Sequence, residues 1–64
     1  MVKVYNEREN KNFEVKSGTL KEIAKQIGVN LNEFIVTVNG ELGIDDRKVE
    51  DNDEVKFLSV VSGG

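Results

Sequence analysis

The sequence contains no cysteine, histidine, tryptophan or proline. The absence of cysteine excludes a disulfide framework, a cysteine nucleophile and a zinc finger. The absence of histidine removes the commonest general base and metal ligand, and with it any Ser-His-Asp catalytic site. A chain of 64 residues also has little room for the pocket of at least about 300 Å³ that a small ligand occupies. We therefore expect a single small domain that is not an enzyme and binds no metal or other cofactor itself.

Basic residues are in the minority, and the formal net charge is −3. No basic stripe is present, so we do not expect nucleic-acid binding, which needs clustered lysine and arginine. The acidic excess is local, because residues 41–54 contain Glu41, Asp45, Asp46, Glu50, Asp51, Asp53 and Glu54. The spacing of these carboxylates does not match a calcium-binding EF-hand loop. We interpret this acidic segment as a solvated loop of turn-forming residues, whose charge can steer a basic surface of a partner.

Long apolar runs are also missing from the chain. The longest are Phe34-Ile35-Val36 and Val60-Val61, which are far too short to span a bilayer. The first residues do not contain the apolar stretch of a secretion signal. We expect a cytoplasmic, monomeric protein that does not contact a membrane.

The first part of the chain has the pattern of a β-hairpin. Apolar and polar residues alternate over residues 1–5 and again over residues 13–16, as they do in half-buried strands. The polar residues 6–12 between these runs are expected to form the turn.

A helix is predicted to follow the hairpin. Its apolar residues recur at helical spacing, at Leu20, Ile23, Ala24 and Ile27. Thr19 and Glu22 have the spacing of a capping box at the helix start, and Gly28 suits a left-handed C-terminal cap. So short a helix is not stable alone, and it must pack its apolar face on the hairpin.

The second half of the chain predicts three further strands. Residues 34–38 are rich in β-branched residues, and Asn39-Gly40 is a strong signal for a two-residue hairpin turn. Glu41-Leu42 would begin the returning strand, and residues 54–60 would form the last one. In the polar segment between them, we expect Ile44 and Val49 to point into the core. We expect the same of Leu31, in the connection after the helix.

These elements define an α+β fold in the order β-β-α-β-β-β, with one helix packed on one face of a small mixed sheet. The order resembles the β-grasp fold of ubiquitin, although the pattern does not reveal the order of the strands in the sheet. We place a single domain at residues 1–60 and a flexible tail at residues 61–64.

The last strand has two faces of different character. If Val55 and Phe57 pack under the helix, Leu58 and Val60 point to the open face of the sheet. Tyr5 lies there too, because it is out of phase with the apolar residues of its own strand. We predict that Tyr5, Leu58 and Val60 form a docking face for a partner. The alternative is that they are ordinary isolated apolar residues on the surface.

The chain ends in Val61-Ser62-Gly63-Gly64. Two terminal glycines pack against nothing, so a frayed end or a cloning remnant is one interpretation. The other is functional, because a tail without bulky side chains can carry its carboxylate through a narrow channel. Residues 61–64 extend about 13 Å at roughly 3.3 Å per residue.

The chain resembles the sulfur-carrier family of thiamine and molybdopterin biosynthesis (the ThiS and MoaD proteins), which are prokaryotic relatives of ubiquitin. The residues that carry the resemblance are Gly18-Thr19-Leu20, Val38-Asn39-Gly40-Glu41, Asp51-Asn52-Asp53-Glu54-Val55 and Val61-Ser62-Gly63-Gly64. Together they extend over essentially the whole chain. The short length and the Asn39-Gly40-Glu41 turn are closer to the thiamine carriers than to the usually longer molybdopterin carriers.

The resemblance implies a function for the C-terminus. An activating enzyme of the ubiquitin-activating type would use ATP and Mg²⁺ to adenylate the carboxylate of Gly64. A sulfur donor would then convert it to a thiocarboxylate, and a second partner, a sulfur-accepting synthase, would receive the sulfur. The tail residues Val61, Ser62 and Gly63 would carry Gly64 into the active site, and the pathway would be thiazole formation for thiamine.

Other functions remain open from the sequence. The same chemistry serves molybdopterin synthesis and tRNA thiolation. A ubiquitin-like modifier would use the same first step and then be joined through Gly64 to lysines of target proteins. A plain β-grasp binding module with an incidental Gly-Gly end is the third possibility.

Overall fold

The structure is a computed structural model that describes residues 1–59. Its elements, in chain order, are β1 (Val2–Asn6), β2 (Lys11–Val15), β3 (Gly18–Thr19), α1 (Leu20–Ile27), the 3-10 turn η1 (Leu31–Glu33), β4 (Phe34–Val38), β5 (Glu41–Leu42), β6 (Lys48–Val49) and β7 (Glu54–Ser59). The predicted hairpin, helix and later strands are therefore present. Two very short strands, β3 and β6, were not predicted.

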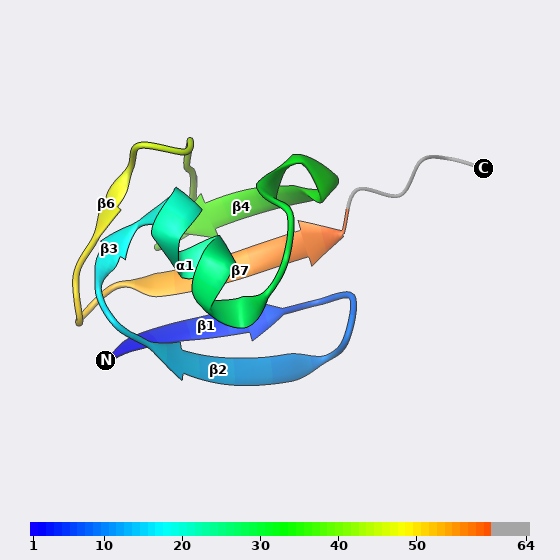
Figure 1. The fold of residues 1–64 in the computed structure, drawn as a ribbon, viewed down its shortest axis with the longest axis horizontal. Coiled ribbons are helices and arrows are strands. Elements are labelled where there is room, and N and C mark those ends of the chain that lie inside the picture. Colours follow the sequence, from blue (N-terminus) through cyan, green and yellow to red (C-terminus); the bar gives the residue numbers. More distant parts are fainter. Residues whose placement is uncertain (60–64) are drawn as a thin grey trace.

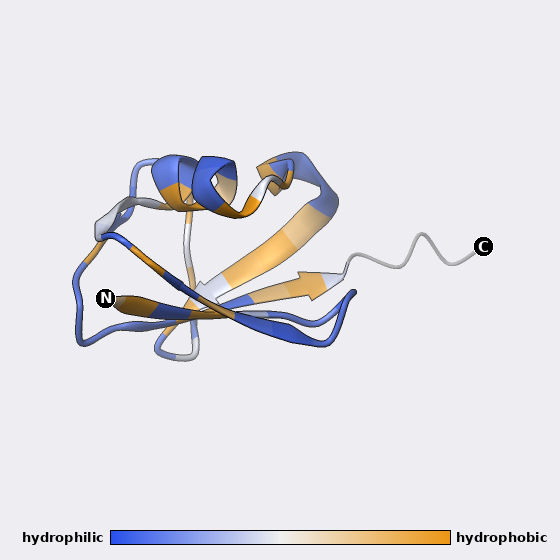
Figure 2. Cartoon of the chain, turned by 60° about the horizontal axis from the view of Figure 1, so that its bottom comes forward, coloured by the Kyte–Doolittle hydropathy of each residue, from blue (hydrophilic) through white to orange (hydrophobic). Residues whose placement is uncertain are grey.

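The last strand lies in the middle of the sheet. The strand order is β2-β1-β7-β4-β5, and β7 runs parallel to β1 and antiparallel to β4. The helix α1 crosses one face of this sheet, and no helix of residues 1–59 lies on the other face (Figures 1 and 2). A mixed sheet with this order and one helix is the β-grasp fold, so the predicted fold class is confirmed.

The helix begins and ends at the residues that the sequence predicted. Thr19 Oγ1 accepts the backbone N–H of Glu22 at 3.2 Å, and the carboxylate of Glu22 accepts the backbone N–H of Thr19 at 2.9 Å. This capping box satisfies two N–H groups that a helix start otherwise leaves free. Gly28 ends the helix in the left-handed conformation, with φ of 77°.

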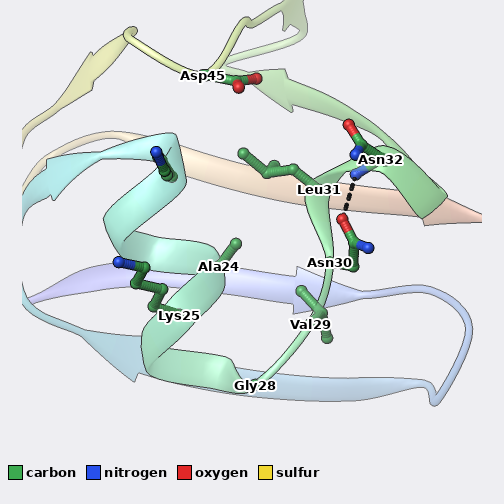
Figure 3. A pocket seen from close by; sticks show the side chains of 9 residues that line it. Ala24, Lys25, Gly28, Val29, Asn30, Leu31, Asn32 and Asp45 are labelled. Carbon is green, nitrogen blue, oxygen red and sulfur yellow. Dashed lines mark hydrogen bonds between the residues drawn. The ribbon is translucent and has the colours of Figure 1, made fainter.

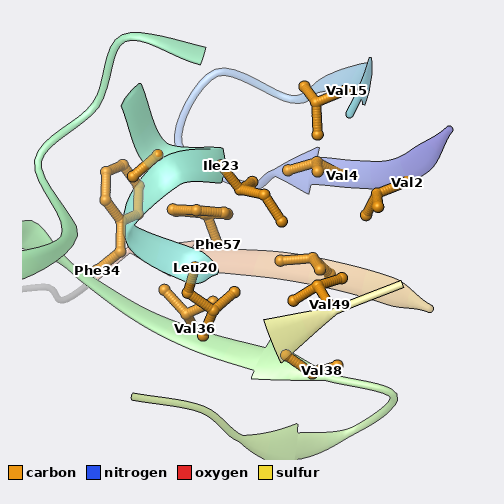
Figure 4. Close-up of a cluster of buried hydrophobic side chains, with 12 residues drawn as sticks. Val2, Val4, Val15, Leu20, Ile23, Phe34, Val36, Val38, Val49 and Phe57 are labelled. Atoms are coloured by element: carbon orange, nitrogen blue, oxygen red, sulfur yellow. The ribbon is translucent and has the colours of Figure 1, made fainter. Parts of the chain in front are cut away.

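The core lies between α1 and the inner face of the sheet (Figure 4). Leu20 and Ile23 of the helix and Val55 and Phe57 of β7 are completely buried. The ring of Phe34 meets that of Phe57 edge to face, with 5.5 Å between the ring centroids. The predicted inward face of the last strand is therefore confirmed. Removing the Phe57 ring would cost about 3–5 kcal/mol, because a cavity would open in the centre of the core.

In the segment between β5 and β7, one of the two residues that we expected in the core is exposed instead. Val49 is buried as expected, but Ile44 is 74% exposed. The reason is a backbone connection to the helix start. The carbonyls of Asp45 and Arg47 accept the N–H groups of Lys21 and Leu20, at 3.2 and 3.0 Å. These bonds fix the path of the segment, and only Val49, in β6, reaches the core.

Two further side chains differ in part from the expectation. Asn6 was assigned to the polar turn, but it belongs to β1 and is buried. Its amide oxygen accepts the N–H of Glu9 at 3.3 Å, so it stabilises the turn from inside the strand. Leu31 is partly buried against the core, as predicted.

The Asn39-Gly40 turn has the predicted geometry and an additional role. Both residues have positive φ, 52° and 85°, as a type I′ turn requires. The side chain of Asn39 also donates to the carboxylate of Asp53 and accepts the N–H of Glu54, both at 2.9 Å. The other carboxylate oxygen of Asp53 accepts the N–H of Glu50. Asp53 therefore connects the β4–β5 turn to the turn before β7, and this part of the acidic segment has a structural role.

These hydrogen bonds make the contribution of Asp53 to stability dependent on pH. The N–H of Glu50 and then the amide of Asn39 hold the pKa of Asp53 below its ordinary value of 3.8. The ionised form is favoured in the folded state, so its stabilisation is present above pH 3.8 and is lost as the pH falls below that value. We expect Asp53→Asn to lower the urea midpoint at pH 7 and to have a smaller effect at pH 3.

Asp46→Asn provides a matched control, because Asp46 is an exposed aspartate of the same segment. It should leave the urea midpoint nearly unchanged at neutral pH. An Asp53→Asn effect of equal size at both pH values would contradict the role given to the carboxylate.

Candidate functional site

The candidate site is the C-terminal end of β7, where the chain leaves the centre of the sheet. Ser59 is the last residue of β7 and pairs with Phe34, the first residue of β4. The predicted reactive residue Gly64, and the residues Val60, Val61, Ser62 and Gly63 before it, lie outside the described part of the chain. The geometry of the site is therefore that of the sheet end from which these residues continue.

Two segments flank this end of β7. On one side is the turn between β1 and β2, and the carboxylate of its residue Glu7 accepts the backbone N–H of Ser59 at 3.3 Å. On the other side are η1 and the start of β4. Arg8 of the β1–β2 turn connects the two, because its guanidinium donates to the Glu33 carboxylate at 3.0 Å and lies 4.5 Å from the centre of the Phe34 ring.

The open face of the sheet holds the predicted residues Tyr5 and Leu58. Both are partly buried. Tyr5 lies between the buried residues Val4 and Asn6, and Leu58 follows the buried Phe57, which places both on the face away from α1. The hydroxyl of Tyr5 donates to the side-chain oxygen of Asn10 at 2.8 Å. The ring of Tyr5 therefore contributes apolar surface to this face, while its polar group is already bonded.

Two further apolar residues of the same face were not predicted from the sequence. Ile35 lies directly opposite Leu58 in the β4–β7 pair and is 46% exposed. Leu42 lies opposite Thr37 in the β4–β5 pair and is 76% exposed. Ile35 could have been predicted from the sequence. In a strand whose residues 34, 36 and 38 face the core, residue 35 points to the outer face.

A groove at the outer edge of β4 extends this apolar surface. It encloses about 320 Å³, and Ile35, Leu42 and Ile44 all line it. Met1 is the remaining large apolar residue that is exposed within residues 1–59, and it lies elsewhere. Exposed apolar side chains are therefore gathered at the β4–β5 edge rather than scattered over the described surface.

A second groove lies between the C-terminal half of α1, η1 and the loop at Asp45 (Figure 3). It is open to solvent, and Ala24, Val29 and Leu31 form its apolar part, with Lys25 and Asp45 among its polar residues. No group of three or more carboxylates placed to hold a metal ion occurs in residues 1–59. This groove shows no arrangement of side chains for acid–base or nucleophilic chemistry.

No helix in the part of the chain that the structure describes is long and apolar enough to cross a membrane. The helix α1 has only eight residues, and its outer face is charged.

The fold defines a ubiquitin-like protein of the β-grasp class. A family model described as the ThiS family matches residues 2–64. The chain therefore belongs to the ThiS family, as the resemblance in its sequence suggested. Proteins of this family are small sulfur carriers rather than catalysts, and they work with activating enzymes and sulfur-accepting synthases.

Proposed function

We propose that this protein is a sulfur carrier whose reactive group is the carboxylate of Gly64, and that it supplies sulfur for thiazole formation in thiamine biosynthesis. The observation that carries the proposal is the family match, which includes the Gly-Gly end. The position of β7 supports it, because the central strand leads directly to the tail. The sequence similarity to the thiamine carriers supports this branch over the molybdopterin branch.

The proposed chemistry takes place at the chain end and in the partner enzyme. The Gly64 carboxylate attacks the α-phosphorus of Mg²⁺-bound ATP, and pyrophosphate leaves. A persulfide then attacks the carbonyl carbon of the acyl-adenylate, and AMP leaves. A second thiol cleaves the resulting acyl disulfide, forming a new disulfide and leaving a thiocarboxylate on Gly64. No histidine or cysteine of the carrier is needed, which agrees with their absence from the sequence.

The tail is long enough for this role. Five residues follow Ser59 in the sequence, and fully extended they reach about 16 Å at roughly 3.3 Å per residue. The body of the carrier can therefore stay at the surface of the activating enzyme while Gly64 reaches the nucleotide. Glycine at the last two positions leaves room for backbone contacts in a narrow channel.

The open face of the sheet is the proposed docking surface for the adenylating enzyme. It contains the predicted residues Tyr5 and Leu58, with Ile35 and Leu42 beside them, and Val60 is proposed to continue it. Asp45 of the acidic segment lines the same groove as Leu42, so a basic rim on the partner would be attracted to this edge.

The proposed chemistry predicts a defined change of mass. Incubation with the adenylating enzyme of the same organism, ATP, Mg²⁺ and a persulfide donor should convert the intact protein to a species in which one oxygen is replaced by sulfur. Deleting Gly64 should abolish this change and leave the circular dichroism spectrum as it was, because the variant keeps every residue of the described core. An unchanged mass for the full chain, or an equal gain for the deletion variant, would contradict the proposal.

If the open face is the docking surface, a substitution on it should weaken binding to the adenylating enzyme without unfolding the carrier. Leu58→Glu places a charge in the apolar surface, and we expect it to raise the KM of the carrier for adenylation at least tenfold. Its cost in stability should be about 1 kcal/mol, because Leu58 is only partly buried. Val29→Glu is the matched control, since Val29 is also a partly buried apolar residue but lines the groove beside α1, on the other side of the sheet. If Leu58→Glu unfolds the protein, or if both variants raise the KM equally, the docking face is wrong.

A further inference from the structure

The hydrogen bonds at the end of β7 depart from those of a regular parallel pair. In such a pair, one residue donates its N–H to one residue of the partner strand and accepts an N–H from the residue two positions further on. Glu7 makes the first bond, from its N–H to the carbonyl of Phe57 at 2.9 Å. The second bond would run from the N–H of Ser59 to the carbonyl of Glu7.

That carbonyl is already used by the β1–β2 turn, where it accepts the N–H of Asn10 at 3.3 Å. The N–H of Ser59 is bonded to the Glu7 side chain instead, with 3.3 Å between the N atom and Oε1. The carboxylate thus replaces the main-chain carbonyl of the same residue. Because of this replacement, the chain can turn toward β2 after Glu7, and the hydrogen bonding between β1 and β7 still extends to Ser59.

The opposite side of Ser59 is restrained as well. Ser59 pairs there with Phe34, whose ring packs on Phe57. The guanidinium of Arg8 lies over the same ring, while it donates to the carboxylate and, at 3.4 Å, to the carbonyl of Glu33. An arginine held by a carboxylate and an aromatic face has few alternative positions. Two residues of the β1–β2 turn thus contact the end of β7 and its neighbour. Glu7 bonds the Ser59 amide, and Arg8 packs on the ring of Phe34.

We infer that Glu7, Arg8, Glu33 and Phe34, which we call the exit clasp, fix the position from which the reactive tail leaves the sheet, and that Glu7 is a positioning residue for adenylation. This inference rests on the proposed function. The exit clasp fixes Ser59, the residue from which the tail continues, before the partner binds. Ordering a residue on binding opposes association, so a tail that starts from a fixed residue binds more tightly than one whose first residue is loose.

The alternative is that Glu7 only stabilises the β1–β2 turn. In that case, its removal would affect the turn but neither the Ser59 amide nor the affinity for the activating enzyme. A positioning role has a different signature. It raises the KM of the carrier and leaves kcat unchanged, because the saturated complex still presents the same Gly64 carboxylate.

Three variants separate these roles. Glu7→Ala removes the acceptor of the Ser59 N–H, while Glu7→Gln retains an oxygen in the same position. Glu9→Ala is the matched control, because Glu9 is an exposed glutamate of the same turn. Its backbone N–H donates to Asn6, and its carboxylate makes no hydrogen bond within residues 1–59. All three substitutions are at exposed positions, so we expect each variant to fold.

The first measurement is hydrogen exchange of the free carrier by NMR, which needs no partner. Glu7→Ala should speed exchange of the Ser59 amide about three- to tenfold, whereas Glu7→Gln and Glu9→Ala should stay within about twofold of the original rate. The amide of the buried Val55 reports global opening, and its exchange should not change.

The second measurement is ATP–pyrophosphate exchange with the adenylating enzyme. Glu7→Ala should raise the KM of the carrier about three- to tenfold with kcat within about twofold, and Glu7→Gln should restore the original KM. The inference is overturned if Ser59 exchange does not change, if it changes without a rise in KM, or if Glu7→Gln is as damaging as Glu7→Ala. Failure of the unaltered carrier to be adenylated would instead count against the proposed function, and the exchange data would still test the clasp.

Discussion

The structure depends on the placement of β7 between β1 and β4. This strand is the last to be made, yet it occupies the centre of the sheet and provides Val55 and Phe57, both fully buried, to the core. Without it, the β1–β2 hairpin and the β4–β5 hairpin would share no strand pairing. The same placement puts Ser59, the last described residue, at the end of the central strand. A tail that follows a central strand leaves from a rigid part of the sheet, held on both sides.

The small size of the chain is compatible with the proposed function, because the proposed reactive group is a main-chain carboxylate. One face of the sheet and the apolar side of α1 are enough to form the core, so the opposite face is free for contact with another protein. Ile35 and Leu58 lie on that free face, opposite each other on neighbouring strands. The catalytic groups, the nucleotide and the sulfur donor are all assigned to partners, so the carrier needs only to fold, dock and present its end.

Local features of the fold were predictable from the sequence, and long-range ones were not. The capping box at Thr19, the left-handed Gly28 and the turn at Asn39 depend on neighbouring residues, and each lies where the pattern placed it. Ile44 was misplaced because apolar character alone does not reveal that the adjacent backbone is bonded to the helix start. The contact of Glu7 with Ser59 joins residues 52 positions apart. No local pattern in the sequence indicates such a contact.

The central claim is that this protein presents its chain end through the end of β7 and docks by the open face beside it. Titration of the isotopically labelled carrier with the adenylating enzyme, followed by NMR, tests this claim most directly. The account predicts that the amide signals of Tyr5, Ile35, Leu58 and Ser59 shift or broaden, while those of Lys21 and Lys25 on the outer face of α1 do not change. Perturbation centred on α1, with the open face unaffected, would contradict it.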